Sequence, residues 1–452
     1  MKKSVNRLSN KKLLKDLLKL AIPIIFANML QTAYNLTDIF WVGRLGAEAV
    51  ASVTMSFPAI LVSIFLISGF SIAGTILVSQ YKGKKNQKKI NHVATQTISL
   101  GTILAIITGV VGYFITPSLI RAMGTETLVE QGAISYLQIS FIGIVFVFGF
   151  MIFESLMRGI GKPKIPMLIV LGTVLLNLIL DPLFIFGYGV IPGFGVSGAA
   201  IATTFTQGIA FLVGLYFISK GRGGIKLDFR KFKFDFKLIK KMFKLGIPTS
   251  IEGSSRSFSM LLLIFIVTQF STGVIAAYGI GIRIMSFIMI PAFGLSIATS
   301  TLVGMAMGAR QVEKADRISR VSMWTSFFGI SFISIFMFLF SGELASFFLP
   351  GETTVIEAAS LFVKLFSLAF GFIGIQLALI GTLRGAGDTK SAMILALITV
   401  WGIRLPLAYL LPIYTDLSYL GVWLAFPIEG VIGAFIVMGI FFRGKWKKKK
   451  IV

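Results

Sequence analysis

Residues 19–23 read KLAIP, and residues 244–248, 225 positions later, read KLGIP. Nearly the same offset relates three further pairs of segments in the same order. They are LV with a following glycine at 77–83 and 302–308, LMRGIG at 156–161 and TLRGAG at 382–387, and GV at 195–196 and 421–422. Ordered matches at one offset indicate an internal duplication. The sequence therefore predicts two halves of similar fold, each opened by a lysine and an Ile-Pro dipeptide.

The composition indicates that both halves lie in a membrane. Of the 452 residues, 56% are hydrophobic and only 13% are charged, which is too little charge for a water-exposed surface. Apolar runs of about 20 to 30 residues cover nearly the whole length, as expected of membrane-spanning helices. The chain has no cysteine and one histidine, His92, beside a basic loop. Thiol chemistry and a histidine metal site are therefore excluded.

The net charge of +25 is unevenly distributed along the chain. Lys and Arg gather at the N-terminus and in every second loop, whereas the intervening loops carry acidic residues. The basic clusters lie near 82–89, 158–164, 220–244, 310–320, 384–390 and 443–450. This is the positive-inside pattern, and it predicts that both termini are cytoplasmic. The basic clusters are expected to face the anionic lipid bilayer, not nucleic acid.

The sequence predicts an all-α polytopic membrane protein with 12 transmembrane helices in two pseudo-symmetric six-helix lobes. The lobes are 1–219 and 240–452, joined by a cytoplasmic linker at 220–239. Because six spans return each half to the same side, the halves are expected to be parallel repeats with a cavity between them. The expected spans are 20–43, 47–79, 92–116, 130–157, 163–187, 195–219, 240–270, 273–307, 318–341, 354–383, 389–413 and 418–442.

The first span carries a polar stripe. Asn28, Gln31, Asn35 and Asp38 follow one another at steps of three, four and three residues, and Tyr34 precedes Asp38 by four. Such a stripe must face protein or a wet cavity, because an ionisable side chain is costly in lipid. Asp38 is therefore the first candidate for an ion site, and a structural hydrogen-bonded seam is the alternative.

The fifth span supplies a second carboxylate. Asn177 and Asp181 are four residues apart and share one helix face, and Pro182 follows at once. If Asp38 and Asp181 face each other, one proton or one small cation relieves their repulsion. The pair is therefore predicted to couple transport to an ion. The alternative is that Asp181 ends its helix near the outer surface.

The second half lacks this pair, because Leu263 and about Leu407 stand at the matching positions. It carries instead Glu252 and Arg256, four residues apart in the seventh span, with Arg404 in the eleventh. A structural pairing of these charges is the preferred interpretation. The ionisable residues in spans for which no role is predicted are Arg283, Lys364 and Glu429.

The sequence contains no enzyme motif. Residues 159–162 read GIGK but are followed by Pro163 where a phosphate loop needs Ser or Thr. The protein is therefore predicted not to be an enzyme and to need no cofactor other than a coupling ion. Its energy is expected to come from an ion gradient.

Taken together, several short motifs resemble the multidrug and toxic compound extrusion (MATE) family over essentially the whole chain. They are IP at 22–23, TDI at 37–39 with VGRLG at 42–46, RGIG at 158–161, Asn177 with DPLFIFG at 181–187, GAAIAT at 198–203 and LRGAGD at 383–388. The resemblance implies a V-shaped pair of lobes. It also implies secondary antiport, in which cationic drugs leave as H⁺ or Na⁺ enters.

The resemblance also implies site residues. In the branch with its ion site in the N-terminal lobe, that site corresponds to Asp38, Tyr34, Tyr136, Asn177, Asp181 and Thr203, and the first helix bends at Pro23. A Na⁺ ion would be held at Asp38, Asn177, Asp181 and Thr203. An acid pair suits a shared proton, whereas the added amide and hydroxyl oxygens suit Na⁺, so both ions stay open.

Two departures from other family members favour the N-terminal site. Those members carry a carboxylate in the tenth span, where this chain has Ile373, and an acid in the seventh span, where it has Arg256. Residues expected to line a substrate cavity or to form a hinge are Pro23, Gln31, Asn35, Glu252 and Arg256.

The expected function is ion-coupled (H⁺ or Na⁺) antiport that exports organic cations or drugs by alternating access. The protein is expected to work as a monomer in a prokaryotic cytoplasmic (inner) membrane. One alternative is a flippase for lipid-linked oligosaccharide or a related lipid precursor, which should carry many basic residues in its cavity. An ion channel is the alternative from another class.

Overall fold

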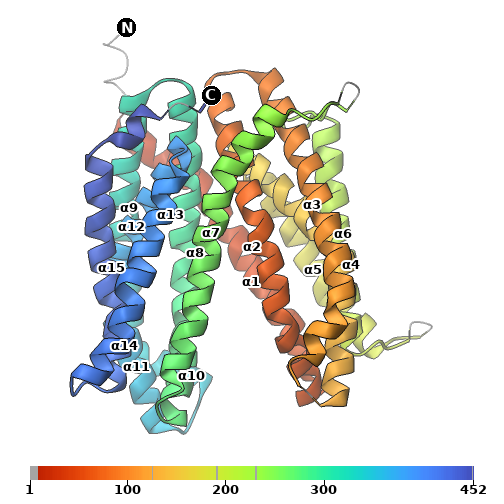
Figure 1. Cartoon of the computed structure of the whole chain (residues 1–452), viewed down its shortest axis with the longest axis vertical. Coiled ribbons are helices and arrows are strands. Elements are labelled where there is room, and N and C mark those ends of the chain that lie inside the picture. The colour runs from red at the N-terminus through yellow and green to blue at the C-terminus, as the bar shows by residue number, and fades with distance from the viewer. Residues whose placement is uncertain (1–8, 125, 190–191, 230–231, 450) are drawn as a thin grey trace. The chain divides into compact units, whose positions relative to one another are not determined.

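The computed structural model describes residues 9–124, 126–189, 192–229, 232–449 and 451–452. Within these ranges the regular elements are helices, as predicted (Figure 1). The first half contains six long helices. They are α1 (Asn10–Gly43), α2 (Ala47–Gly83), α3 (Gln87–Arg121), α4 (Thr127–Gly159), α5 (Lys164–Phe186) and α6 (Val196–Ser219).

The second half repeats this order with interruptions. Its helices are α7 (Phe236–Val267), α8 (Thr272–Gly308), α9 (Val312–Leu339), α10 (Ser341–Phe348), α11 (Thr353–Ser367), α12 (Phe370–Ala386), α13 (Thr389–Thr399), the π-helical turn η2 (Val400–Arg404), α14 (Leu405–Tyr414), α15 (Tyr419–Phe442) and the 3₁₀ turn η3 (Lys445–Lys448). The predicted span 354–383 is in fact α11 and α12, bent by 52°. The predicted span 389–413 is α13, η2 and α14. The short helix α10 was not predicted.

The number of membrane-spanning helices agrees with the prediction. Among the described residues, ten helices are long and apolar enough to cross a membrane, and the bent pair α11–α12 raises the number to 11. Helix α1 has 34 residues but carries the polar stripe, which lowers its hydrophobicity. With α1 included, the twelve predicted spans are accounted for.

The chain divides into two compact units. The N-terminal unit is Phe26–Ser250, and the C-terminal unit combines the described part of Met1–Ile25 with Ile251–Val452. Helices α1 and α7 each contribute to both units, and each passes from one to the other two residues after a proline, Pro23 or Pro248. A proline inside a helix removes a backbone hydrogen bond and weakens the helix there.

The same arrangement of helices recurs inside each unit. Helix α4 packs on α2, α3 and α6, and helix α12 packs on α8, α9 and α15. Small residues allow the close approach of the central helix. A Cβ atom on Gly159 of α4 would lie 3.1 Å from the carbonyl oxygen of Thr75, and one on Gly385 of α12 would lie 2.3 Å from that of Ser300. Because Ser300 follows Thr75 by 225 residues, the duplication extends to packing.

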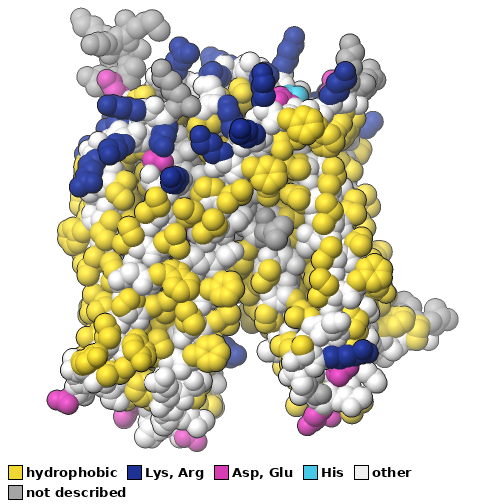
Figure 2. Space-filling view, viewed as in Figure 1, with side chains coloured by type: hydrophobic (Ala, Val, Ile, Leu, Met, Phe, Trp, Pro, Cys, Tyr) yellow, Lys and Arg dark blue, Asp and Glu magenta, His cyan; other side chains and the backbone are white. Residues whose placement is uncertain are grey.

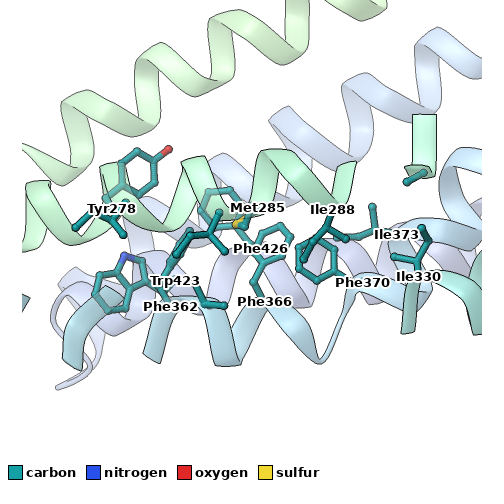
Figure 3. Packing of buried hydrophobic residues seen from close by; sticks show 14 of the residues in the cluster. Tyr278, Met285, Ile288, Ile330, Phe362, Phe366, Phe370, Ile373, Trp423 and Phe426 are labelled. Carbon is teal, nitrogen blue, oxygen red and sulfur yellow. The ribbon is translucent and has the colours of Figure 1, made fainter. Parts of the chain in front are cut away.

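The core of the C-terminal unit is rich in aromatic side chains. Figure 3 shows Phe362, Phe366 and Phe426 lying against one another between α8, α11 and α15. The ring centroids of Phe366 and Phe426 are 5.2 Å apart. The first part of α1 adds Leu17 and Ile24 to the same cluster, so this part of α1 is held by apolar burial.

The segment between α6 and α7 is hydrogen-bonded to α3. The backbone N–H groups of Lys226, Asp228 and Asp235 donate hydrogen bonds to Asn91, Thr95 and Gln96, respectively. His92 Nε2 lies 3.0 Å from Asp235 Oδ2. The hydrogen bonds that Asp235 receives from His92 and from the backbone N–H of Leu238 hold the pKa of its carboxyl below the ordinary value.

Charge is sorted along each unit, as Figure 2 shows. Most Lys and Arg side chains lie at one end, acidic side chains gather at the other, and a hydrophobic band separates them. This is the distribution expected of helices that cross a bilayer.

Candidate functional site

Two carboxylates come together in the N-terminal unit. Asp38 of α1 is half-buried and accepts a hydrogen bond from Thr203 Oγ1 of α6 at 3.2 Å. Asp181 and Asn177 of α5 are fully buried, and Asn177 Nδ2 donates to Asp181 Oδ1 at 2.8 Å. The Asp38 and Asp181 carboxyls also lie close enough to interact electrostatically with each other. We call Asp38, Asn177, Asp181 and Thr203 the acidic site.

Three oxygens of the acidic site have no hydrogen-bond donor. They are Asp38 Oδ1, Asn177 Oδ1 and Asp181 Oδ2, and all three are buried. A buried acceptor without a donor is costly, and two adjacent carboxylates repel each other. One shared proton, or one small cation held by the three oxygens, removes both costs. The arrangement is therefore able to bind and release a single positive charge.

Two tyrosines border the acidic site. The hydroxyls of Tyr34 on α1 and Thr206 on α6 are 2.6 Å apart, and Tyr136 on α4 lies within electrostatic range of both carboxylates. Thr206 was missed in the sequence analysis. The available signal was its position three residues after Thr203, which places both hydroxyls on one face of α6.

The other candidates on α1 lie away from this site. Gln31 and Asn35 are exposed, so only the Tyr34 and Asp38 side of the polar stripe takes part. Pro23 is buried in the part of α1 that belongs to the C-terminal unit. Arg283 and Lys364, for which no role was predicted, are exposed.

The C-terminal unit contains a buried charge network. Glu252 on α7 is 1% exposed. Its Oε1 lies 3.7 Å from Arg256 Nη2, as the helical spacing suggested, but only 2.8 Å from Arg384 Nη2 of α12. This stronger partner was not predicted from the sequence. The repeat aligns Arg384 with Arg158, so the sequence pointed to this position but did not indicate that Arg384 contacts Glu252.

A second ion pair lies beside the first. Arg404 Nη2 on η2 is 2.7 Å from Glu429 Oε2 on α15. Gln376 Nε2 donates to the other oxygen of Glu429 at 3.3 Å. The Arg404 guanidinium also lies 4.9 Å from the centre of the Phe426 ring. These contacts give Arg404 and Glu429 a partner each.

The duplicated units of membrane-spanning helices define a polytopic membrane protein. The profile of the MatE family matches residues 23–183 and 248–410, once in each half, and the chain belongs to this family. Its members are transporters and not enzymes, as predicted.

Relatives match over nearly the whole chain. A Bacillus subtilis protein described as "Probable multidrug resistance protein YoeA" is 30% identical over 436 residues, which are 95% of this chain and 93% of that protein. A crystal structure of MATE in complex with MaL6 is similar at 25% identity with a TM-score of 0.91, covering 97% of this chain and 98% of that one. These likenesses confirm the predicted two-lobe, twelve-helix fold.

A second similar structure is that of a MOP superfamily transporter from Pyrococcus furiosus. It is 25% identical with a TM-score of 0.89, over 96% of this chain and 97% of that one. It is described with the words "Reverse polarity of binding pocket suggests different function".

Proposed function

We propose that this protein exports organic cations and drugs from the cytoplasm in exchange for H⁺ or Na⁺, by alternating access. The observation that carries the proposal is the proximity of Asp38 to Asp181, with three buried oxygens that lack a donor. The multidrug resistance named for the B. subtilis relative supports the substrate class.

Exchange follows from competition for one negative site. When a proton or Na⁺ occupies the acidic site, the repulsion between Asp38 and Asp181 is relieved and the unpartnered oxygens are satisfied. When the ion leaves, the same charge attracts an organic cation. Binding of either positive species therefore weakens binding of the other. This coupling lets an ion gradient supply the free energy for export.

Helix α1 is the element that changes conformation when the ion is exchanged. Its second part is attached to α6 through the Asp38–Thr203 and Tyr34–Thr206 hydrogen bonds. Its first part belongs to the other unit, and Pro23 lies just before the change of unit. Loss of the two hydrogen bonds on ion exchange frees the second part of α1 to bend at this proline. The basic ends of the helices face the cytoplasm of a prokaryotic cell in this scheme.

Transport in vesicles tests the proposal. Purified protein is reconstituted in liposomes, and ethidium movement is followed under a pH gradient and a Na⁺ gradient applied separately. One gradient is expected to drive exchange. Asp38→Asn and Asp181→Asn should each lower the initial rate about tenfold or more, because the coupling between ion and substrate is lost. The control is Glu343→Gln, which neutralises an exposed acid in the C-terminal unit.

Three results would contradict the proposal. Full gradient-driven transport by the Asp38→Asn, Asp181→Asn double variant would exclude the acidic site as the coupling site. Steady ion currents without saturable exchange would indicate a channel. Flipping of a lipid-linked sugar precursor, with no ethidium transport under either gradient, would indicate a flippase.

A further inference from the structure

Five charged side chains lie together in the C-terminal unit. They are Glu252, Arg256, Arg384, Arg404 and Glu429, which we call the arginine cluster. Three arginines against two glutamates leave a net charge of 3 − 2 = +1. Arginine cannot release its proton in a protein, so the surplus charge persists at every physiological pH.

Both glutamates of the arginine cluster are already occupied. Arg384 contacts both oxygens of Glu252, with Nη2–Oε1 at 2.8 Å and Nε–Oε2 at 3.3 Å. Arg404 and Gln376 take the two oxygens of Glu429, at 2.7 and 3.3 Å. Glu252 Oε1 is close to Arg384 Nη2 but accepts no hydrogen bond. It is the only oxygen of the two carboxylates within ion-pair distance of Arg256.

Arg256 is the surplus cation. Its Nη2 nitrogen is 3.7 Å from Glu252 Oε1, beyond hydrogen-bonding distance, and is buried without a hydrogen-bond partner. Arg404 Nε is a second buried donor without a partner. Arg256 also lies within electrostatic range of Arg384, Arg404 and Glu429. The Arg256 side chain is half-buried, and its Nη2 is a buried donor. A buried donor without an acceptor is costly, and an anion that joins it removes this cost.

The surroundings of Arg256 suit an organic anion. Trp401 is 42% exposed, and its Nε1 donates to Ser255, the neighbour of Arg256 in sequence, at 2.5 Å. Phe426 packs on the Arg404 guanidinium. Phe426 is buried, so Trp401 is the aromatic side chain open to a ligand beside the cations. The planar fork of arginine matches the two oxygens of a carboxylate.

A local irregularity positions two of these side chains. Trp401 and Arg404 both lie on the π-helical turn η2, where the backbone N–H of Leu405 bonds to the carbonyl of Val400, five residues earlier. Pro406 has no N–H to give the carbonyl of residue 402, which favours this wider turn. Single π-helical turns occur often at functional sites.

We infer that the arginine cluster is a binding site for the carboxylate of an amphipathic organic substrate, with Arg256 as the primary contact and Arg404 beside it. The inference rests on the proposed export function and extends its substrate class to organic anions and zwitterions. The acidic site and the arginine cluster would then recognise opposite charges.

Ligand binding to the purified full-length protein tests this inference. The probes are naphthoate, its neutral analogue naphthamide, and inorganic phosphate, and the readout is the shift of the thermal-unfolding midpoint with ligand concentration. Naphthoate should stabilise the wild type. Its affinity should fall about tenfold or more in Arg256→Gln, because a charged hydrogen-bonding partner is lost, and less in Arg256→Lys. Arg283→Gln, which removes an exposed arginine of the same unit, is the matched control and should bind naphthoate as the wild type does.

The ligand-free midpoint separates a binding site from a purely structural network. A surplus charge that awaits an anion costs stability, so Arg256→Gln without ligand should unfold at or above the wild-type midpoint. Unfolding well below it would overturn the inference, as would unchanged naphthoate affinity in this variant. Equal binding of naphthamide, or stabilisation by phosphate and not by naphthoate, would overturn the inference that the site binds an organic carboxylate. This binding measurement uses no ion gradient, so its result can be interpreted even if ion-coupled export is not observed.

Discussion

The two halves of the chain share their packing but differ in the sign of their buried charge. Gly159 and Gly385 allow the central helix of each unit to approach the backbone of a neighbouring helix closely. Yet the N-terminal unit has unpartnered acceptors around Asp38 and Asp181. The arginine cluster has two unpartnered donors, on Arg256 and Arg404, and one unpartnered acceptor, Glu252 Oε1. The scaffold thus holds either charge, and the chemistry depends on a few side chains placed on it.

The same reversal occurs where each half ends. After α6 the chain returns along α3, where an acid of the connecting segment, Asp235, meets His92 of the helix at 3.0 Å. After α15 the chain returns along α9, where a base of the tail, Lys447, meets Asp316 of the helix at 2.8 Å. Both contacts join an acidic and a basic side chain, but the acid lies on the connecting segment in the first half and on the helix in the second.

Breaking an ion pair of the arginine cluster should have the largest effect on stability. Arg404→Leu removes the main partner of Glu429, which is 1% exposed. An uncompensated buried carboxylate costs about 3 to 5 kcal/mol. Unfolding in detergent, followed by intrinsic fluorescence, should show this loss, and adding Glu429→Gln should restore much of it. No loss in the single variant would mean that water reaches Glu429.

The matched glycines should respond unequally to alanine. In Gly385→Ala the new methyl group meets a backbone oxygen at 2.3 Å, whereas in Gly159→Ala the distance is 3.1 Å. Overpacking costs about 1 to 3 kcal/mol, so Gly385→Ala should lower the unfolding midpoint clearly and Gly159→Ala much less. Equal midpoints for the two variants would show that the halves do not differ in packing at this position.

The contact between Asp235 and His92 should give the smallest effect, and one that depends on pH. The pKa of Asp235 lies below its ordinary value, so its contribution to stability is complete above about pH 4 and is lost as the pH falls through the lowered value. Because this carboxyl is 33% exposed, solvent screening limits the contribution to about 0.5 kcal/mol. Asp235→Asn keeps an oxygen for the Leu238 N–H and should unfold with a flatter acid dependence. An unchanged pH profile would contradict this role.

Much of the fold was predictable because its signals are local or periodic. The KLAIP and KLGIP segments revealed the duplication, and apolar runs between basic clusters located the spans. The break between α11 and α12 has no such signal, since no proline separates Ser367 from Phe370. Its position depends on packing. Pro23 marked a bend in α1, but that the two parts of this helix belong to different units depends on tertiary packing.

The candidate site was predictable only where spacing along one helix decides the contact. Asn177 and Asp181 share a face of α5 by spacing alone. The partners Thr206 and Arg384 lie on other helices, so their contacts with Tyr34 and Glu252 require the tertiary arrangement.

The most direct test of the acidic site as the coupling site is an equilibrium measurement of ethidium binding to the purified protein. The dissociation constant is measured at a series of pH values without sodium, and at a series of NaCl concentrations at fixed pH. If one ion and the organic cation compete for Asp38 and Asp181, binding should weaken in proportion to the concentration of that ion once its site is filled. The Asp38→Asn, Asp181→Asn variant should lose this dependence. Ethidium affinity that is independent of both ions, or the same dependence in the double variant, would contradict the account.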